Sequence, residues 1–409
     1  MPRSLALLLL APSLASAQPT VTFEQALALS DASPAAEAPR RELATREPLD
    51  DGIGGTAQAT NVTLMPGLGL GADQAAGLDA QAAVTQSWNL ADLGGVRRRA
   101  AREERQALGA RARADALRVR LEAARRWIDL ATFQEVAATL EAQREVLAAR
   151  LERTERARAA GVASALDVAA ARAALAELEQ RRLDVEGDRV GAANQLAVAM
   201  GRPPERGLRA EGPLPSPALP RRAAIEARLA RFEALPEVVA SRLASLAARA
   251  REAEASAAYA PVLAVGAQLE RSVADTWVVY GIASLTFNAF GEERRAVSRS
   301  AAEADRAEVE LDAARVRARA EVEDALHDLE HGWRRLRGLE AELLPALDAL
   351  VASSERALAA GEETVFAVHD ARRRQLDVLE VAARARGALS WARVRLWLML
   401  AELARGADA

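Results

Sequence analysis

Two histidines one helical turn apart form the only group in the sequence with the spacing of a catalytic metal site. The segment His327–His331 fits the H-x-x-E-H pattern of inverted zinc proteases, in which both histidines bind the metal. Such a zinc site also needs a third ligand and a pocket. This segment lies midway along a predicted long helix, beside Trp333 and several arginines. We therefore interpret the histidines as a solvated or inter-helix pair, with metal binding as the alternative, and predict neither catalysis nor a cofactor.

The composition argues against several classes of function. The chain contains no cysteine, which excludes disulfides and thiolate metal sites. Its net charge is −4 with both signs interspersed, so no basic face for nucleic acid is predicted. Aromatic residues make up only 3% of the chain, too few for one large globular core. The abundant alanine, leucine and arginine instead favour long helices packed at close range.

The first residues have the parts of a secretory signal peptide. A basic start at Arg3 is followed by an apolar run over residues 4–11 and by the A-x-A site Ala15-Ser16-Ala17. We predict cleavage after Ala17. No later stretch approaches the roughly 18 uninterrupted apolar residues of a membrane-spanning helix. The sequence therefore predicts that any insertion into a membrane uses a β-barrel.

The chain contains two copies of one long unit. The segment around Gly161 recurs around Gly361, at an offset of 200 residues. The segment opening at Pro66 recurs at Pro261, at an offset of 195, and a glycine–arginine junction that starts at residue 93 recurs at an offset of 197. Three matches in the same order indicate an internal repeat and not chance similarity.

Each copy is predicted to hold two strands and a long helical hairpin. Residues 78–89 alternate between apolar and polar side chains, which indicates a strand between an apolar and a polar medium. Residues 277–287 alternate less regularly. The partner strands are predicted to open at Pro66 and Pro261, because proline is tolerated at a strand start.

The helices are predicted to pack as coiled coils. Leucines and other apolar residues after Leu117 fall at spacings of four, seven and eight, which is a narrow seam. Pro345 is predicted to bend the third long helix. The predicted helices cover residues 96–160, 164–200, 292–358 and 364–404.

The two copies differ before their strands. The second copy has an unbroken predicted helix from Pro236 to Tyr259, whereas residues 47–55 of the first copy contain Pro48 and three glycines. We predict that the first copy's short helix is broken or lost there. The predicted domains are a signal peptide (1–17), an N-terminal periplasmic segment (18–61), the first repeat (62–201), a proline-rich linker (202–221), the second repeat (222–405) and a tail (406–409).

Four strands cannot close a membrane barrel, because the smallest single-chain barrels have about eight. An open sheet edge in lipid would leave its N–H and C=O groups unpaired, at a cost of several kcal/mol for each group. We therefore predict a mostly α fold with a small β part, in which the four β-strands of each chain join a barrel shared between subunits. The long coiled-coil hairpins continue that barrel as an α-helical conduit.

Several motifs, in their order and spacing, resemble those of the TolC-like outer-membrane efflux family. Residues 22–27 (TFEQAL) are similar to the family's opening T-x-E-x-A-L, and residues 258–261 (AYAP) to its tyrosine-proline strand entry. Residues 85–98 are similar to its strand-to-helix junction, and the match covers about residues 20–405. The resemblance implies a homotrimer with a twelve-stranded transmembrane β-barrel in the outer membrane of a Gram-negative bacterium. It also implies a periplasmic α-helical tunnel (an α-barrel) that meets a periplasmic adaptor protein and an inner-membrane pump.

The resemblance places the functional residues at the two hairpin turns. Family members with a constriction ring carry two aspartates three residues apart; here Asp167 keeps the first position in one hairpin and Asp370 the second position in the other. Both are candidates for a pore constriction, and the alternative is that acids in the first turns of a helix favour its dipole, by about 0.3–1 kcal/mol. The tips implied to dock an adaptor carry Arg158, Gly161, Val162, Ser164, Leu166, Arg356, Gly361 and Glu363.

The predicted function is a passive exit duct for small molecules, either drugs or metals, set in outer-membrane lipid. The outer-membrane component of a type I protein secretion system is the alternative within this class. A periplasmic adaptor or structural coiled-coil protein is the alternative from another class. An adaptor would carry one helical hairpin and no lipid-facing strands, which the repeat argues against.

Overall fold

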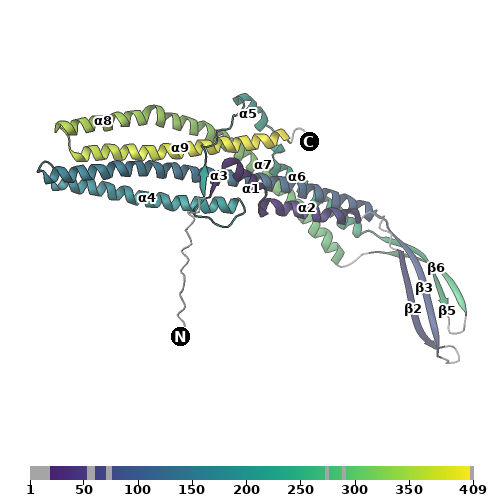
Figure 1. The fold of residues 1–409 in the computed structure, drawn as a ribbon. Helices are drawn as coiled ribbons and strands as arrows, with labels where there is room; N and C mark the ends of the chain where they lie inside the picture. The colour runs from purple at the N-terminus through teal and green to yellow at the C-terminus, as the bar shows by residue number, and fades with distance from the viewer. Residues whose placement is uncertain (1–18, 53–59, 71–75, 272–275, 288–291, 406–409) are drawn as a thin grey trace, which may run out of the picture. The chain divides into compact units, whose positions relative to one another are not determined.

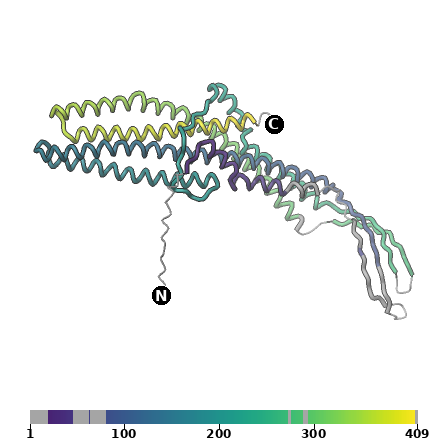
Figure 2. Tube along the Cα trace, viewed as in Figure 1, coloured from purple at the N-terminus to yellow at the C-terminus, as the bar shows by residue number. Residues whose placement is uncertain are grey.

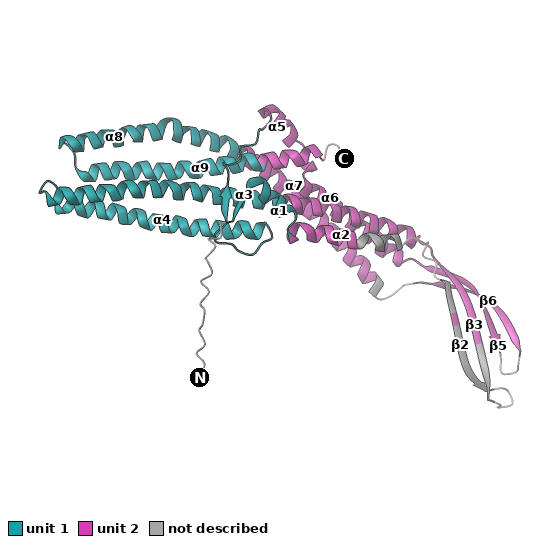
Figure 3. Ribbon diagram, viewed as in Figure 1, with its two compact units in different colours: residues 1–33, 120–218, 327–395 teal, residues 34–119, 219–326, 396–409 magenta. Residues whose placement is uncertain are grey.

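The computed structural model describes residues 19–52, 60–70, 76–271, 276–287 and 292–405 (Figures 1 and 2). The predicted signal peptide, the predicted tail and the repeat match at residues 290–291 lie outside these ranges. The chain divides into two compact units, coloured in Figure 3: residues 1–33, 120–218 and 327–395, and residues 34–119, 219–326 and 396–409. Among the described residues, no helix combines the length and the apolar character needed to cross a membrane.

The first unit contains the turns of both predicted hairpins and most of their helices. Helix α3 (Leu93–Ala159) turns into α4 (Ala165–Ala199), and α8 (Leu344–Ala360) turns into α9 (Val365–Arg405). Apolar residues of α3, α4 and α9 share one buried cluster, so the two hairpins pack on each other as the narrow seam predicts. The cluster contains Val136, Leu140, Leu178, Val185, Leu376 and Ala383.

The third long helix is interrupted where the sequence predicts a bend. Helix α7 (Glu292–Gly338) is followed by a π-helical segment, η2 (Leu339–Leu343), and α8 begins directly after it. Pro345 lies in the first turn of α8. Proline lacks an N–H and clashes with the preceding turn, and a π-helical turn is one of the usual ways in which a helix absorbs such a defect.

The N-terminal segment is fixed against α3 in the first unit. Strand β1 (Thr20–Thr22) pairs in parallel with β4 (Arg209–Glu211), which lies within the segment interpreted from the sequence as a linker. Trp127 of α3 donates a hydrogen bond from Nε1 to Val21 O at 2.9 Å, and its ring meets that of Phe23 edge-on. Phe23 begins α1 (Phe23–Asp31). Strands of three residues are too short to show alternation, which explains why the sequence analysis missed this pairing.

The second unit contains one antiparallel sheet of four described strands. They are β2 (Thr60–Leu70), β3 (Ala76–Asn89), β5 (Val262–Arg271) and β6 (Trp277–Thr286), in the order β2-β3-β5-β6. A strand of the first copy therefore pairs directly with a strand of the second. The helices of this unit include α5 (Arg222–Leu229), the 3₁₀ turn η1 (Phe232–Ala234) and α6 (Pro236–Ala258).

The predicted strand start at Pro66 is wrong. Strand β2 begins at Thr60, and Pro66 stands opposite Ala80 of β3, inside the paired region. Proline has no N–H to donate, so β2 lacks one possible ladder hydrogen bond at this position. The other predicted start is confirmed, since β5 begins directly after Pro261.

The prediction of a broken helix at residues 47–55 is also wrong for its described part. Helix α2 (Pro34–Gly52) continues through Pro48, and residues 53–59 lie outside the described ranges. Helix propensity is a weak prior that packing overrides, even for a proline that costs about 3 kcal/mol. Packing is present at the start of α2, where Ala36 is fully buried. Further along, Leu43 lies against Gly109 of α3, where an added Cβ would be 3.9 Å from Leu43 Cδ2.

Candidate functional site

The first hairpin turn combines a left-handed glycine with a capped helix start. Gly161 has φ 75°, and its N–H donates a hydrogen bond to Arg158 O at 2.9 Å. Glycine reaches this backbone conformation without the steric cost that a Cβ adds. The Oγ of Ser164 accepts a hydrogen bond from Asp167 N at 3.2 Å, and Asp167 Oδ2 accepts one from Ser164 N at 2.9 Å. These reciprocal bonds form a capping box at the start of α4.

The second hairpin turn repeats the glycine but not the reciprocal cap. Gly361 has φ 78°, and its N–H donates to Leu358 O at 3.1 Å. The Oγ1 of Thr364 accepts a hydrogen bond from Ala367 N at 3.3 Å. Ala367 has no side-chain acceptor to return that bond. The N–H of Thr364 instead donates to the neighbouring Glu363 carboxylate at 3.2 Å.

An ion pair joins the two arms of each hairpin at equivalent positions. Arg172 of α4 donates to Glu155 of α3, with 2.6 Å between Nη2 and Oε1. Arg372 of α9 donates from Nε to Glu355 of α8 at 3.0 Å. The side chain of Arg172 is 65% exposed and that of Arg372 is 20% exposed. The repeat therefore preserves the pair but buries its arginine further in the second hairpin.

The residues predicted to dock an adaptor lie at or beside these two turns. All eight are exposed in the described structure, and two of them are large apolar side chains: Val162 is 84% exposed and Leu166 is 63% exposed. The eight residues are Arg158, Gly161, Val162, Ser164, Leu166, Arg356, Gly361 and Glu363. At both turns, a glycine in the left-handed conformation therefore lies beside exposed apolar and charged side chains.

The two aspartates predicted to line a constriction have different surroundings. The hydrogen bonds from Ser164 hold the pKa of the Asp167 carboxyl below its usual range. Asp370 is exposed on α9, and its Oδ2 lies 2.7 Å from Nη2 of Arg374, one turn further along the same helix. Asp167 therefore stabilises the start of its helix, as the alternative to a constriction expects. Asp370 takes no part in the cap of α9 and pairs with Arg374 instead.

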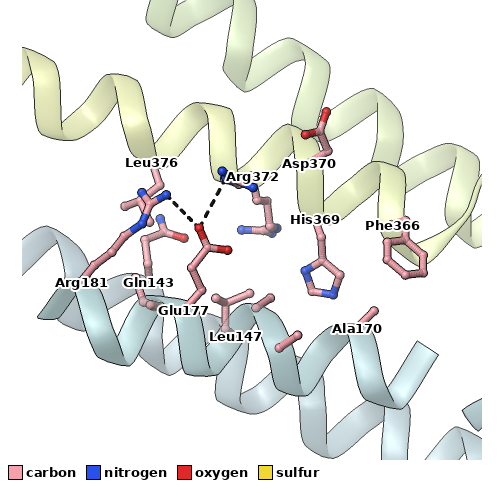
Figure 4. Close-up of a pocket in the computed structure, with 14 residues that line it drawn as sticks. Gln143, Leu147, Ala170, Glu177, Arg181, Phe366, His369, Asp370, Arg372 and Leu376 are labelled. Carbon is pink, nitrogen blue, oxygen red and sulfur yellow. Dashed lines mark hydrogen bonds and ion pairs between the residues drawn. The ribbon is translucent and has the colours of Figure 1, made fainter. Parts of the chain in front are cut away.

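A groove of about 290 Å³ lies between α4 and α9, with α3 beneath them (Figure 4). Gln143 and Leu147 of α3 line it, together with residues from the first turns of α4 and α9, including Ala170 and Phe366. Figure 4 shows the imidazole of His369 pointing into this groove and the carboxylate of Asp370 pointing to the other side of α9. The groove therefore begins at the hairpin turns and separates the two hairpins.

Three ion pairs between described residues join α4 and α9 beside the groove. Arg181 of α4 pairs with Asp377 of α9 and lies 3.7 Å from Glu380 of the same helix. Arg373 of α9 lies 3.5 Å from Glu177 of α4. The sequence analysis did not identify them. A signal was present, because Glu177 and Asp377 are acids at the same position of the two copies.

His369 is the titratable group of this groove that the sequence analysis overlooked. Burial lowers the pKa of its imidazole, and the nearby positive charges of Arg150 and Arg372 lower the pKa further. Its Nε2 atom is buried and has no hydrogen-bond partner among the described residues. These surroundings therefore favour the neutral form of the imidazole.

The histidine pair singled out from the sequence lies elsewhere, on α7. His327 and His331 are exposed, and their rings are stacked with 5.8 Å between centroids and 5° between planes. Across the described residues, no group of three or more histidine, aspartate or glutamate side chains is arranged to hold a metal ion. The third ligand of a zinc-protease site is thus missing from the described part of the chain.

The chain is similar to known proteins in its fold and not in its sequence. No protein-family model and no curated protein sequence matches it. Solved structures do: the outer-membrane channel OprN has a TM-score of 0.77 at 20% identity, covering 92% of this chain and 89% of that one. The Campylobacter jejuni CmeC outer membrane channel has a TM-score of 0.75 at 14% identity, covering 93% and 85%. CusC, whose structures describe transmembrane channel formation, has a TM-score of 0.66 at 14% identity, covering 92% and 91%.

The chain therefore has the fold of these outer-membrane channels. The fold expected from the resemblance to the TolC-like family, with its long helical hairpins and small β part, is confirmed. The TM-scores establish the fold. The activity does not follow from them, because the identities are 20% and below.

Proposed function

We propose that this protein is a subunit of an outer-membrane channel that acts as a passive exit duct for small molecules. The duct would span the outer membrane and periplasm of a Gram-negative bacterium and would carry out no reaction. The observation that carries this proposal is the likeness in fold to outer-membrane channels over 92% of the chain. Two hairpins and four antiparallel strands also favour it over a periplasmic adaptor, for which one hairpin is expected.

The sheet supports assembly into a homotrimer. Among the described strands, β2 and β6 are the two outer ones, and each has one backbone edge unpaired within the chain. In lipid such an edge is costly, so β6 of one subunit would pair with β2 of the next to close the shared barrel. The protein should fractionate with outer membranes and migrate as a trimer in mild detergent. A soluble periplasmic monomer would contradict the proposal.

A disulfide scan tests this pairing directly. Within one chain β2 and β6 are separated by β3 and β5, about 14 Å at the usual strand spacing, which is beyond the reach of a disulfide. Thr63→Cys, combined in turn with a cysteine at each position from 277 to 283, should give oxidised trimers for at least one pair. The same cysteines combined with Asp188→Cys on α4 should give none.

We further propose that the two hairpin turns dock a periplasmic adaptor, which in turn contacts an inner-membrane pump. The exposed apolar residues Val162 and Leu166 beside a rigid glycine turn support this assignment. Val162→Cys and Glu363→Cys should crosslink to the adaptor in cells. Asp188→Cys should not, because it lies about 36 Å along α4 from Ser164. We place the cysteine at Val162 and not at Ser164, because the Ser164 hydroxyl caps α4 and its loss would disturb the turn. Equal crosslinking at all three positions would remove the assignment.

Asp167 and Asp370 are proposed as the acidic groups of a constriction near these turns. In a trimer, three copies of each carboxylate would surround one opening and concentrate cations there. The exposed position of Asp370 on α9 supports the proposal more strongly than that of Asp167, whose carboxylate is engaged by Ser164.

A further inference from the structure

The exposed histidine pair on α7 has no role in the proposed duct. The chain contains only three histidines, and two of them stand one helical turn apart. The imidazoles of His327 and His331 are exposed and nearly parallel, with 5.8 Å between ring centroids. Side chains at positions i and i+4 are neighbours on a helix surface, so the two rings share one patch.

The charged neighbours of the pair are already engaged. Asp328 lies 3.8 Å from Arg395 of α9, and Glu330 lies 3.0 Å from Arg334 on the same helix. Within the described residues, neither imidazole has a hydrogen-bond or ion-pair partner. The carboxylates therefore do not hold the rings in place, and rotation of the two side chains can direct one nitrogen of each ring at a common point.

Two imidazoles on one helical turn can chelate a divalent transition-metal ion. Imidazole suits Cu²⁺, Ni²⁺ and Zn²⁺, and at a given nitrogen site Cu²⁺ binds most tightly of the three. Because no group of three ligands exists among the described residues, water would fill the remaining positions. Such a site differs from a structural zinc site, which has four protein ligands.

We propose that His327 and His331 bind one divalent transition-metal ion, Cu²⁺ most tightly, through two imidazole nitrogens. The bound ion would hold one turn of α7 closed, shortly before the π-helical segment at Leu339–Leu343. The proposal does not depend on the function of the protein as a channel, because it rests on the geometry of one helix.

Titration of the detergent-solubilised mature protein with Cu²⁺ alone tests the site, provided that any purification tag is free of histidine. One ion should bind per chain, and its electron paramagnetic resonance spectrum should show two imidazole nitrogens. His327→Ala and His331→Ala should each weaken binding by about tenfold or more, whereas His369→Ala should leave it unchanged. Acidification should release the ion, because protons compete for the same nitrogens.

A spacing control separates chelation from the mere presence of histidine. The double variant Asp328→His with His331→Ala keeps two histidines but places them at adjacent positions, which do not face each other on a helix. It should bind Cu²⁺ as weakly as His331→Ala alone. Binding by this variant as tight as that of the wild type, or wild-type binding no tighter than that of His327→Ala, would overturn the proposal.

Discussion

The turn at Gly161 and the turn at Gly361 close two hairpins with the same backbone and different capping groups. Both glycines have φ near 75–78°, and each hairpin carries an ion pair between glutamate and arginine at equivalent positions. In the first turn an aspartate completes a reciprocal cap with Ser164. In the second turn Ala367 stands at that position, and Asp370 lies three residues later with its carboxylate outside the cap.

This difference separates residues that shape the turn from residues that are free for another task. After duplication, the groups that set the backbone are the same in both copies: the glycine, the hydroxyl of the cap and the inter-arm ion pair. The positions of the acids have diverged. Asp167 therefore has a capping role that explains its position. Asp370 takes no part in the cap and pairs only with the exposed Arg374 of the same helix, so it is the stronger candidate for a role in the pore.

The shared glycine gives the largest expected effect. Gly161→Ala and Gly361→Ala should each destabilise their own turn by about 1–2 kcal/mol, because a Cβ is strained at positive φ. Hydrogen exchange of the amides in that turn should become about 5–30 times faster, with the other turn unchanged. Gly187→Ala in α4 is the matched control, since an added Cβ there meets nothing within 4 Å. It should stabilise the helix by about 0.5–1 kcal/mol. Equal exchange in the glycine variants and the wild type would show that the turns are not held in this conformation.

Removing the capping aspartate from the first turn and adding one to the second turn tests whether this residue accounts for the difference between the turns. Asp167→Ala should destabilise the start of α4 by about 0.3–1 kcal/mol, because it removes one half of a capping box and a charge that favours the helix dipole. Ala367→Asp should stabilise the start of α9 by a similar amount, since Thr364 already supplies the other half. Amide exchange should become faster at the start of α4 in Asp167→Ala and slower at the start of α9 in Ala367→Asp. If Ala367→Asp has no effect, the two turns are less alike than their backbones indicate.

The comparison also shows how far the sequence could be interpreted alone. Both turns and both long hairpins were predictable, because the repeat marks Gly161 and Gly361 and the seam marks the helices. The continuation of α2 through Pro48 was not, because proline in a helix interior predicts a break. Strand β1 was not, because it depends on contacts with distant parts of the chain. The same reason applies to His369, whose single sequence position gave no sign that α3 and α4 would enclose it.

Removing charge from the proposed constriction should have a smaller effect, and the sign of that effect can be predicted. Asp370→Asn should lower the cation selectivity of single channels, and Arg374→Gln should raise it, because Arg374 lies 2.7 Å from the Asp370 carboxylate and offsets its charge. Each change should alter the permeability ratio by about twofold, since exposed pairs interact by only about 0.2–1 kcal/mol and salt screens them. Reversal potentials in a salt gradient measure this ratio. Unchanged selectivity in both variants would remove Asp370 from the pore.

The smallest expected effect is a pH dependence that only the second hairpin should show. Burial lowers the pKa of His369 in the folded protein, and Arg150 and Arg372 lower the pKa further. When the turn opens, the imidazole regains its ordinary pKa of about 6.5 and takes up a proton more readily. Its contribution to the closed state is therefore fully present above about pH 6.5 and is lost progressively as the pH falls below that value. The charged groups that act on His369 are Arg150 and Arg372, and Arg372 is paired with Glu355.

Amide exchange in the second turn, corrected for its intrinsic dependence on pH, should therefore accelerate between about pH 7.5 and about pH 5.5. His369→Gln should remove most of that acceleration, because glutamine stays neutral at both values. The first hairpin provides an internal control, since Ala169 occupies the equivalent position and cannot titrate. An equal acceleration in both turns, or in the variant and the wild type, would show that acid loosens the helices through other groups. The imidazole would then be only a packed ring in the groove.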